Sequence, residues 1–144
     1  MMREEFVTKS ILGFLKTKGY SIISFDFPQS GTGILLHPDI PQDKNGGIKP
    51  DIIASKGRFL LIMENKERYW KDDFEKLHRL KTCVDYTRDL KKLHSQYNTT
   101  FLKVGVGIPN NKKTIEKALE SGRLVDFIIV VDEHGDCKVI FGKV

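Results

Sequence analysis

The order of apolar and polar positions predicts two adjacent β-strands in the middle of the chain. Segments 51–55 and 58–66 consist mainly of β-branched and large apolar residues, as do strands that enter a protein core. Lys56 and Gly57 lie between them and predict a tight turn, so the two strands should form a hairpin. The second strand is unusual because its apolar run ends abruptly in charged residues.

This hairpin places three charged residues on one face of the predicted strands. Side chains alternate across a strand, so Glu64 and Lys66 point the same way. If Ser55 pairs with Arg58 across the turn, Asp51 joins that face as a diagonal neighbour of Glu64, with the two Cβ atoms roughly 7 Å apart. A loop longer by one residue would move Asp51 to the opposite face. The placement of Asp51 therefore depends on the turn.

The rest of the chain predicts an α/β fold with a mixed central β-sheet flanked by helices. Apolar residues at helical spacing near the N-terminus are followed by Gly19, which is typical of a helix end. Segment 28–50 is rich in proline and glycine and predicts a long loop with at most one short strand, at 33–37. The other predicted elements are helices over 4–19, 71–94 and 112–122, and strands over 20–28, 101–109, 124–132 and 137–144.

Composition narrows the class of protein. With 144 residues, of which 40% are hydrophobic and 30% charged, we expect a single domain over 1–144 with a sizeable core. Cys83 and Cys137 lack the spacing of a zinc site, and no apolar run is long enough for a membrane span or a signal peptide. These features predict a cytoplasmic protein with free thiols and no membrane partner. The net charge of +5 is spread along the chain, so any argument for nucleic acid must come from a specific site.

Two carboxylates and a lysine on one face are suited to metal-dependent hydrolysis of a phosphodiester. Asp51 and Glu64 supply the hard oxygen ligands that Mg²⁺ prefers, and this ion keeps part of its water shell. A bound Mg²⁺ contacts a phosphate oxygen and lowers the pKa of a bound water. Lys66 could hold that water or offset negative charge in the transition state. The alternative is a strand-end cluster in which Lys66 merely pairs with a carboxylate.

The pattern of Asp51 after a proline, twelve intervening residues, and then Glu64, Asn65 and Lys66 resembles that of the PD-(D/E)XK nuclease superfamily. This group includes many type II restriction endonucleases and the archaeal-type Holliday junction resolvases. The resemblance covers the motif and the order of elements from the first helix to the strand after the second helix. It implies a restriction-endonuclease-like core, Asp51 and Glu64 as Mg²⁺ ligands, the Asn65 backbone carbonyl as a further ligand, and Lys66 as a residue that helps to activate the attacking water.

The same resemblance implies a glutamate from the first helix near the metal. Glu4 precedes Val7 and Ile11 by three and seven residues, so it lies on the apolar stripe that faces the sheet. Glu5 is rotated from it by about 100° toward the polar side. We favour Glu4, with Glu5 as the alternative. An acidic residue that complements the helix dipole in the first turn would explain Glu4 equally well.

Other residues compete for these roles. Asp39 also follows a proline and a short apolar run, but no tight turn connects it to Glu64, so it is the weaker candidate ligand. Trp70 follows the motif among basic residues, where it could stack on a nucleic-acid strand or, with Phe74, begin the buried stripe of the next helix. The charged positions of that helix are predicted to form a solvated face. The four histidines show no metal spacing and no triad.

These patterns predict a Mg²⁺-dependent DNA endonuclease, with Mn²⁺ as an alternative ion, in which water attacks a backbone phosphate in line. The long loop before the motif favours a type II restriction-type enzyme, since it can carry contacts that read a DNA sequence. A Holliday-junction-resolving nuclease is the nearest alternative, and either would act as a homodimer because two strands are cut at related positions. Two other classes remain open. One is a nucleic-acid-binding domain without hydrolysis, and the other is a small-molecule enzyme, for which the sequence contains no nucleotide fingerprint.

Overall fold

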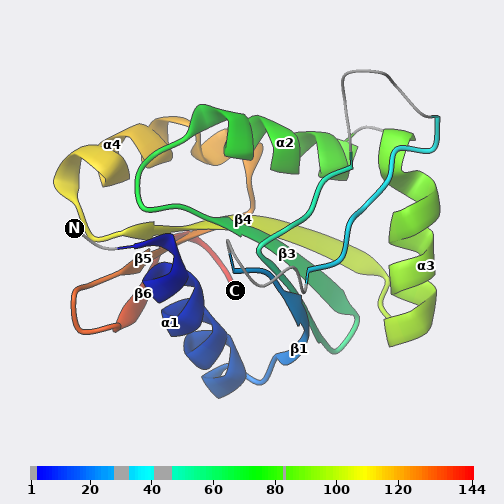
Figure 1. Ribbon diagram of the computed structural model, residues 1–144, viewed down its shortest axis with the longest axis horizontal. Coiled ribbons are helices and arrows are strands. Elements are labelled where there is room, and N and C mark those ends of the chain that lie inside the picture. The colour runs from blue at the N-terminus through cyan, green and yellow to red at the C-terminus, as the bar shows by residue number, and fades with distance from the viewer. Residues whose placement is uncertain (1–2, 28–32, 41–46, 83) are drawn as a thin grey trace.

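The computed structural model of the protein describes residues 3–27, 33–40, 47–82 and 84–144. They form a six-stranded sheet in which the strands follow one another in chain order: β1 (Ser21–Phe25), β2 (Ile52–Lys56), β3 (Phe59–Asn65), β4 (Phe101–Pro109), β5 (Phe127–Val131) and β6 (Cys137–Gly142) (Figure 1). The central strands β3, β4 and β5 are parallel, and the pairs toward each edge are antiparallel. The predicted α/β class with a mixed central sheet is confirmed.

Helices cover both faces of this sheet (Figure 1). Helix α1 (Glu4–Thr17) packs on one face, whereas α2 (Lys71–Thr82), α3 (Thr87–Tyr97) and α4 (Lys112–Glu120) pack on the other. Short 3₁₀ turns follow α2 and α4, at Val84–Tyr86 and Gly122–Leu124. No helix in the described part of the chain is both long enough and apolar enough to cross a membrane.

Strand β3 lies between two apolar layers. Leu61 and Met63 pack with the α1 side of the core, whereas Leu60 and Ile62 pack with the α2 side. All four side chains are fully buried, and each contributes roughly 1.5–3 kcal/mol relative to an exposed side chain. Burial on both faces is typical of strands in parallel sheets covered by helices. The end of β3 is therefore held firmly in position, which matters because Glu64 lies there.

The turn between β2 and β3 differs from the prediction. Lys56 pairs with Phe59, and Gly57 and Arg58 form the turn, so the predicted pairing of Ser55 with Arg58 is wrong. Gly57 has a φ of 57°, a left-handed conformation that glycine adopts without steric cost and that tight hairpin turns require. The pairing is displaced by two residues along the partner strand. Because side chains alternate with a period of two, every side chain keeps the face that the sequence predicted.

The single helix predicted over 71–94 is wrong. The chain divides there into α2 and α3, and α3 turns away from the axis of α2 (Figure 1). Thr82 and Thr87 flank the break, and their hydroxyl groups donate to the backbone carbonyls of His78 and Val84. β-branched residues have a low helix propensity, and such side-chain hydrogen bonds compete with helical ones. Periodicity alone did not reveal this local competition.

Asp39 lies beside the first turn of α3. Its Oδ1 accepts the Arg88 N–H at 2.9 Å, as an acidic residue at a helix N-terminus does. This contact accounts for Asp39 without a metal. The short strand predicted at 33–37 reduces to a single bridge between Leu36 and Ile48, and the rest of the predicted loop lies partly outside the described residues.

Candidate functional site

Two carboxylates meet where β2 begins and β3 ends. Asp51 immediately precedes β2, and its N–H donates to the Met63 carbonyl at 3.0 Å. Glu64 follows Met63 in β3, and the pairing of Ile52 with Met63 places Asp51 beside it. Both side chains are buried, with 8% and 4% of their surfaces exposed. The two predicted ligands therefore lie side by side rather than diagonally.

Asn65 holds the Asp51 carboxylate in place. Its backbone N–H donates to Asp51 Oδ2 at 2.7 Å, and its side-chain Nδ2 donates to Thr8 Oγ1 of α1 at 3.1 Å. In an extended strand the N–H and C=O of one residue point to the same side, so the Asn65 carbonyl also faces Asp51. The next residue, Lys66, bonds in the opposite direction, to the Gly107 carbonyl of β4 at 3.0 Å, as this alternation requires. Asn65 thus ties α1 and the strand end to the carboxylate pair.

The surroundings of the pair disfavour two negative charges. Burial raises the pKa of the Glu64 carboxyl well above its ordinary value, and the neighbouring charge of Asp51 raises it further. Burial also raises the pKa of Asp51, although the hydrogen bond from the Asn65 N–H opposes that shift. Two buried carboxylates in contact are costly to ionise together unless a cation compensates them. The site is therefore arranged to favour a positive ion.

Lys66 supplies a fixed positive charge beside the pair. Partial burial acts to lower its pKa, but neighbouring carboxylates outweigh this effect and raise the pKa. These carboxylates belong to Asp73, Glu4, Asp51 and Glu64. Lys66 is therefore an ammonium ion at neutral pH, suited to donating hydrogen bonds and offsetting negative charge, and unsuited to accepting a proton.

Glu4 reaches the site from the first turn of α1. Its Oε1 lies 3.6 Å from the Lys66 Nζ, and burial raises its pKa although the Lys66 charge opposes the shift. Glu5 instead pairs with Lys9 along the exposed side of the helix, at 3.3 Å. The helical spacing thus correctly distinguishes the residue that faces the sheet from the one that faces solvent.

A further buried carboxylate, Asp73 of α2, was not predicted. It is only 3% exposed, and the Lys76 Nζ lies 3.8 Å from Asp73 Oδ1 and 3.7 Å from Glu64 Oε1. The predicted solvated face of this helix is therefore wrong at Asp73. Its spacing contained the signal, because Asp73 precedes Leu77 and Leu80 by four and seven residues and so lies on their buried stripe.

Asp26 also contributes charge at this edge of the sheet, and it too was not predicted. It follows β1, and its N–H donates to the Asp51 carbonyl at 2.8 Å. Its carboxylate lies 3.6 Å from the Lys49 Nζ, and its charge adds to the effects that raise the pKa of Asp51. No motif links residue 26 to the pair, because pairing between strands β1 and β2 is what brings it close.

The oxygen donors fit a small, hard cation such as Mg²⁺. Glu64 Oε1 and Asp73 Oδ2 are buried and have no hydrogen-bond partner among the described residues. Buried acceptors of this kind are rare unless an ion or water satisfies them. Within the described ranges, no group of three or more His, Cys, Asp or Glu side chains is arranged as a complete metal site. Mg²⁺ needs only one or two carboxylates, because water completes its shell.

A hollow of about 320 Å³ adjoins the ion pair between Lys66 and Glu4. Its other lining residues are Glu67, Arg68 and Trp70. Trp70 is 46% exposed, whereas Phe74 is buried, so only Phe74 belongs to the buried stripe of α2. Any substrate that reaches Lys66 through this hollow also meets an arginine and an aromatic ring.

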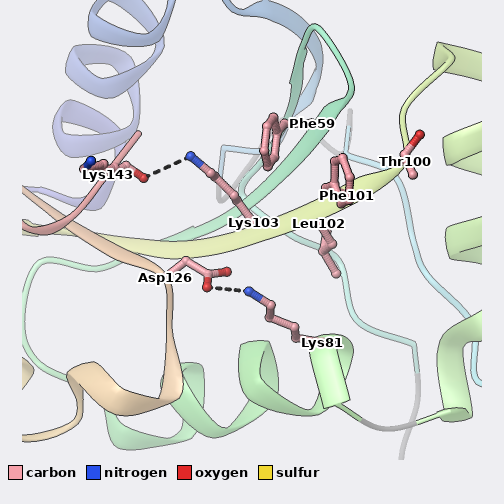
Figure 2. Close-up of a pocket in the computed structure, with 8 residues that line it drawn as sticks. All are labelled: Phe59, Lys81, Thr100, Phe101, Leu102, Lys103, Asp126 and Lys143. Carbon is pink, nitrogen blue, oxygen red and sulfur yellow. Dashed lines mark hydrogen bonds and ion pairs between the residues drawn. The ribbon is translucent and has the colours of Figure 1, made fainter.

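A larger hollow, of about 580 Å³, lies at the opposite end of β3 (Figure 2). Phe59 lines it at the start of the strand, so it lies about 16 Å from Glu64 along β3. Lys81 and Asp126 form an ion pair across this hollow. Size alone would select this hollow, but it lacks the paired carboxylates of the β2–β3 edge.

Other residue types that often bind metals occur away from this edge. His37 and His94 each contact a neighbouring polar side chain, at 3.2 and 2.7 Å. Cys137 is a free, half-buried thiol, and burial raises its pKa to about 11. Cys83 lies outside the described residues.

Comparison with known proteins adds no assignment. No model of a known protein family matches the sequence, and no curated protein matches it.

Proposed function

We propose that this protein is a Mg²⁺-dependent endonuclease that hydrolyses phosphodiester bonds in DNA. The observation that carries the proposal is the contact between two buried carboxyl groups, Asp51 and Glu64, with a Glu64 oxygen that has no hydrogen-bond partner among the described residues. Such a pair is costly in a folded protein unless a cation uses it. Carboxyl groups with perturbed pKa values are typical of catalytic sites. Lys66, two residues after Glu64, lines the hollow of about 320 Å³ and so connects this strand end with it.

The ligand roles follow from the positions of the oxygen atoms. Asp51 and Glu64 would hold the ion through their carboxylates, and the Asn65 carbonyl is directed to the same side. Bound Mg²⁺ would supply positive charge to a phosphate oxygen and lower the pKa of a water molecule. The Asn65 N–H keeps Asp51 oriented at 2.7 Å, so the ligand is preorganised before any ion arrives.

Lys66 would stabilise the reaction as a cation. Its pKa is raised by the surrounding carboxylates, despite the opposing effect of burial, so its ammonium group can donate to the attacking water or to a phosphate oxygen. Glu4 lies 3.6 Å away and would orient this ammonium group. Preorganised charges of this kind stabilise a transition state that is more negative than the ground state.

Support for the superfamily comes from the motif and from the element order. The chain runs α1, β1, β2, β3, α2, α3 and β4 through the region of resemblance, with the Asp51 and Glu64 pair at the β2–β3 edge. We therefore retain the restriction-endonuclease-like core as part of the proposal. A type II restriction-type enzyme is favoured over a junction-resolving nuclease because the long loop before the motif can carry contacts that read a DNA sequence. A homodimer is the expected assembly.

Plasmid cleavage tests the proposal directly. We expect purified protein to nick or linearise plasmid with Mg²⁺ and to lose this activity in EDTA, in Asp51→Asn and in Glu64→Gln. Glu116→Gln is the matched control because Glu116 is exposed on α4. Discrete fragments would favour restriction activity, and selective cutting of four-way junctions would favour resolution. Binding of duplex, single-stranded and junction DNA without any cutting would reject the nuclease and support a binding domain.

Ion binding can be measured without catalysis. We expect Mg²⁺ to raise the melting temperature of the wild-type protein, since an ion that binds only the folded state at about 100 times its Kd stabilises by roughly 2.7 kcal/mol. The rise should disappear in Glu64→Gln and persist in Glu116→Gln. Equal shifts in both variants would show that the ion binds elsewhere.

A further inference from the structure

Trp70 is the single tryptophan of the chain, and it is conspicuously exposed. It lies directly before α2, and its carbonyl accepts the Asp73 N–H at 3.2 Å, so its backbone is joined to the first turn of that helix. Its ring lines the hollow of about 320 Å³ together with Lys66. An exposed aromatic ring in this position is available to a ligand.

Arg68 covers part of this ring. Its guanidinium carbon lies 5.4 Å from the Trp70 ring centroid, a cation–π distance that steadies both side chains. In the described part of the chain, no carboxylate lies within ion-pair distance of Arg68. A stacked guanidinium keeps its N–H groups in its own plane, where they can bind a phosphate. The hollow therefore combines an aromatic surface with a guanidinium that has no ion-pair partner among the described residues, although the carboxylates of Glu4 and Glu67 also line it.

The size and contents of the hollow suit one nucleotide. Its volume of about 320 Å³ is at the lower end of the range of about 300–1,000 Å³ for small-molecule sites. A phosphate beside Lys66 carries its sugar and base into the same space, because the three are covalently joined. Trp70 then offers the base a stacking surface, as aromatic side chains do in proteins that bind single strands.

We propose that the hollow binds an unpaired base, stacked on Trp70, of the nucleotide whose phosphate lies between Lys66 and Arg68. This inference rests on the proposed nuclease function and specifies its substrate. A base inside a duplex is stacked on both faces and cannot also stack on Trp70. The substrate must therefore contain an unpaired nucleotide at the cleavage position, or the protein must rotate one out of the duplex.

Tryptophan fluorescence tests the stacking without catalysis, because Trp70 is the only tryptophan in the sequence. In EDTA, we expect a single-stranded oligonucleotide to quench the emission and a wholly abasic strand of equal length to leave it unchanged. Two duplexes are compared next, one with a single unpaired nucleotide and one that is fully paired. Quenching only by the duplex with the unpaired nucleotide indicates that the site needs a base that is already unpaired. Quenching by both duplexes indicates that the protein rotates a base out of the duplex.

Variants of Trp70 measure how much its ring contributes to the affinity for single-stranded DNA. Binding is followed through the fluorescence anisotropy of a labelled single strand. Trp70→Leu should weaken binding roughly tenfold, the size expected from the loss of one base–aromatic stack. Trp70→Phe should restore most of the affinity. Phe101→Leu is the matched control, because Phe101 is 52% exposed at the other end of the molecule, and it should bind like the wild type.

A second pair of variants tests the phosphate contact. Arg68→Gln should weaken binding and reduce its dependence on salt, because one phosphate contact is lost. Arg58→Gln is the control, since Arg58 donates to Thr100 at the far end of β3. Circular dichroism and thermal melts of every variant separate loss of binding from loss of fold.

The outcomes distinguish this inference from the nuclease proposal. Quenching without cleavage by the wild type would retain the base site and reject the nuclease. Cleavage with no quenching, or equal quenching by the abasic strand, would reject the base site and retain the nuclease. An emission change that depends on protein concentration, without DNA, would also reject the base site and assign Trp70 to contact between two copies of the chain.

Discussion

The two ends of β3 differ in a way that locates the site. At the Phe59 end, the hollow is larger, but the carboxylate that lines it is partly exposed and already paired (Figure 2). Asp126 pairs with Lys81 and also accepts the Val104 N–H at 2.9 Å. A charge that is stabilised both by water and by an ion-pair partner lowers the stability of the fold very little. It therefore has little tendency to bind a further ion.

At the Glu64 end the hollow is smaller, but the charges are buried and incompletely paired. Burial raises the pKa of both Glu64 and Asp51, and Glu64 Oε1 has no hydrogen-bond partner among the described residues. Such an arrangement lowers the stability of the folded chain. The electrostatic cost of a site, rather than the volume of a hollow, therefore indicates where a ligand is needed.

The largest expected difference between the two ends is in catalysis. Lys66→Ala should lower the rate of plasmid cleavage by about 10²–10³-fold, because a preorganised charge at the transition state is lost. Lys103→Ala is the matched change at the other end, where the Lys103 Nζ lies 4.8 Å from the Phe59 ring centroid, and it should leave the rate unchanged. The measurement is the initial rate with Mg²⁺. A similar loss in both variants would show that the Glu64 end of β3 is not the catalytic end.

The pH dependence of stability is the next test, measured by urea unfolding in EDTA. The ordinary pKa of a glutamate is 4.5, and that of Glu64 in the folded protein is raised by burial and then by the Asp51 charge. Between these two values the folded state binds more protons than the unfolded state. The free energy of unfolding therefore falls as pH rises through this window, by up to about 1.4 kcal/mol per pH unit for one proton.

Glu64→Gln isolates this effect. Glutamine cannot ionise, so the variant should become more stable relative to wild type as pH rises through the window, and the gain should level off above it. The difference between the two proteins cancels contributions from other titrating groups. A variant that is less stable than wild type at neutral pH would contradict the proposed cost of the buried pair.

Alanine substitutions at two glycines should lower the stability of the fold by similar amounts but differ in their effect on cleavage. A Cβ at Gly107 would overlap Ile11 Cδ1 and Asn65 Oδ1, so Gly107→Ala should destabilise by about 1–3 kcal/mol and displace Asn65. Gly57→Ala at the turn meets no neighbour, but its φ of 57° should cost about 1–2 kcal/mol. Only Gly107→Ala should also reduce cleavage. Equal activity, at a temperature where both variants are folded, would show that Asn65 does not position the site.

The smallest difference is expected between two lysines of α2. Lys76 contacts the buried Glu64 and Asp73, so Lys76→Met should cost about 1–2 kcal/mol, a value discounted because Lys76 is one-third exposed. Lys81 pairs with the partly exposed Asp126, so Lys81→Met should cost less than about 1 kcal/mol. Urea unfolding at neutral pH in EDTA measures both. A larger loss of stability in Lys81→Met would show that the charges at the Phe59 end of β3, and not those at the Glu64 end, are the more costly to leave unpaired.

Part of the candidate site could be predicted because strand geometry is regular. The turn prediction was wrong at Ser55 and Arg58, yet Asp51 still lies beside Glu64, because a displacement of two residues preserves the face of a strand. Helical spacing likewise separated Glu4 from Glu5. These predictions succeeded because they depended only on local periodicity.

Other residues could not be placed in this way. Asp26 meets Asp51 only through the pairing of β1 with β2, and this pairing joins segments separated by a long loop. Trp70 and Phe74 begin the same helical region, but only the packing of α2 against the sheet decides which of the two is buried. Sequence spacing states which residues share a face and leaves open what covers it.

The α/β class, the common face of Asp51 and Glu64, and the orientation of Glu4 could be predicted from the sequence alone, because each follows from the repeat of a strand or helix. The tertiary structure was needed to show that Asp73 and Asp26 approach the pair and that Trp70 remains exposed beside Lys66. These features depend on how separate elements pack. Packing balances burial, charge and hydrogen bonding over the whole molecule, and no local repeat records that balance.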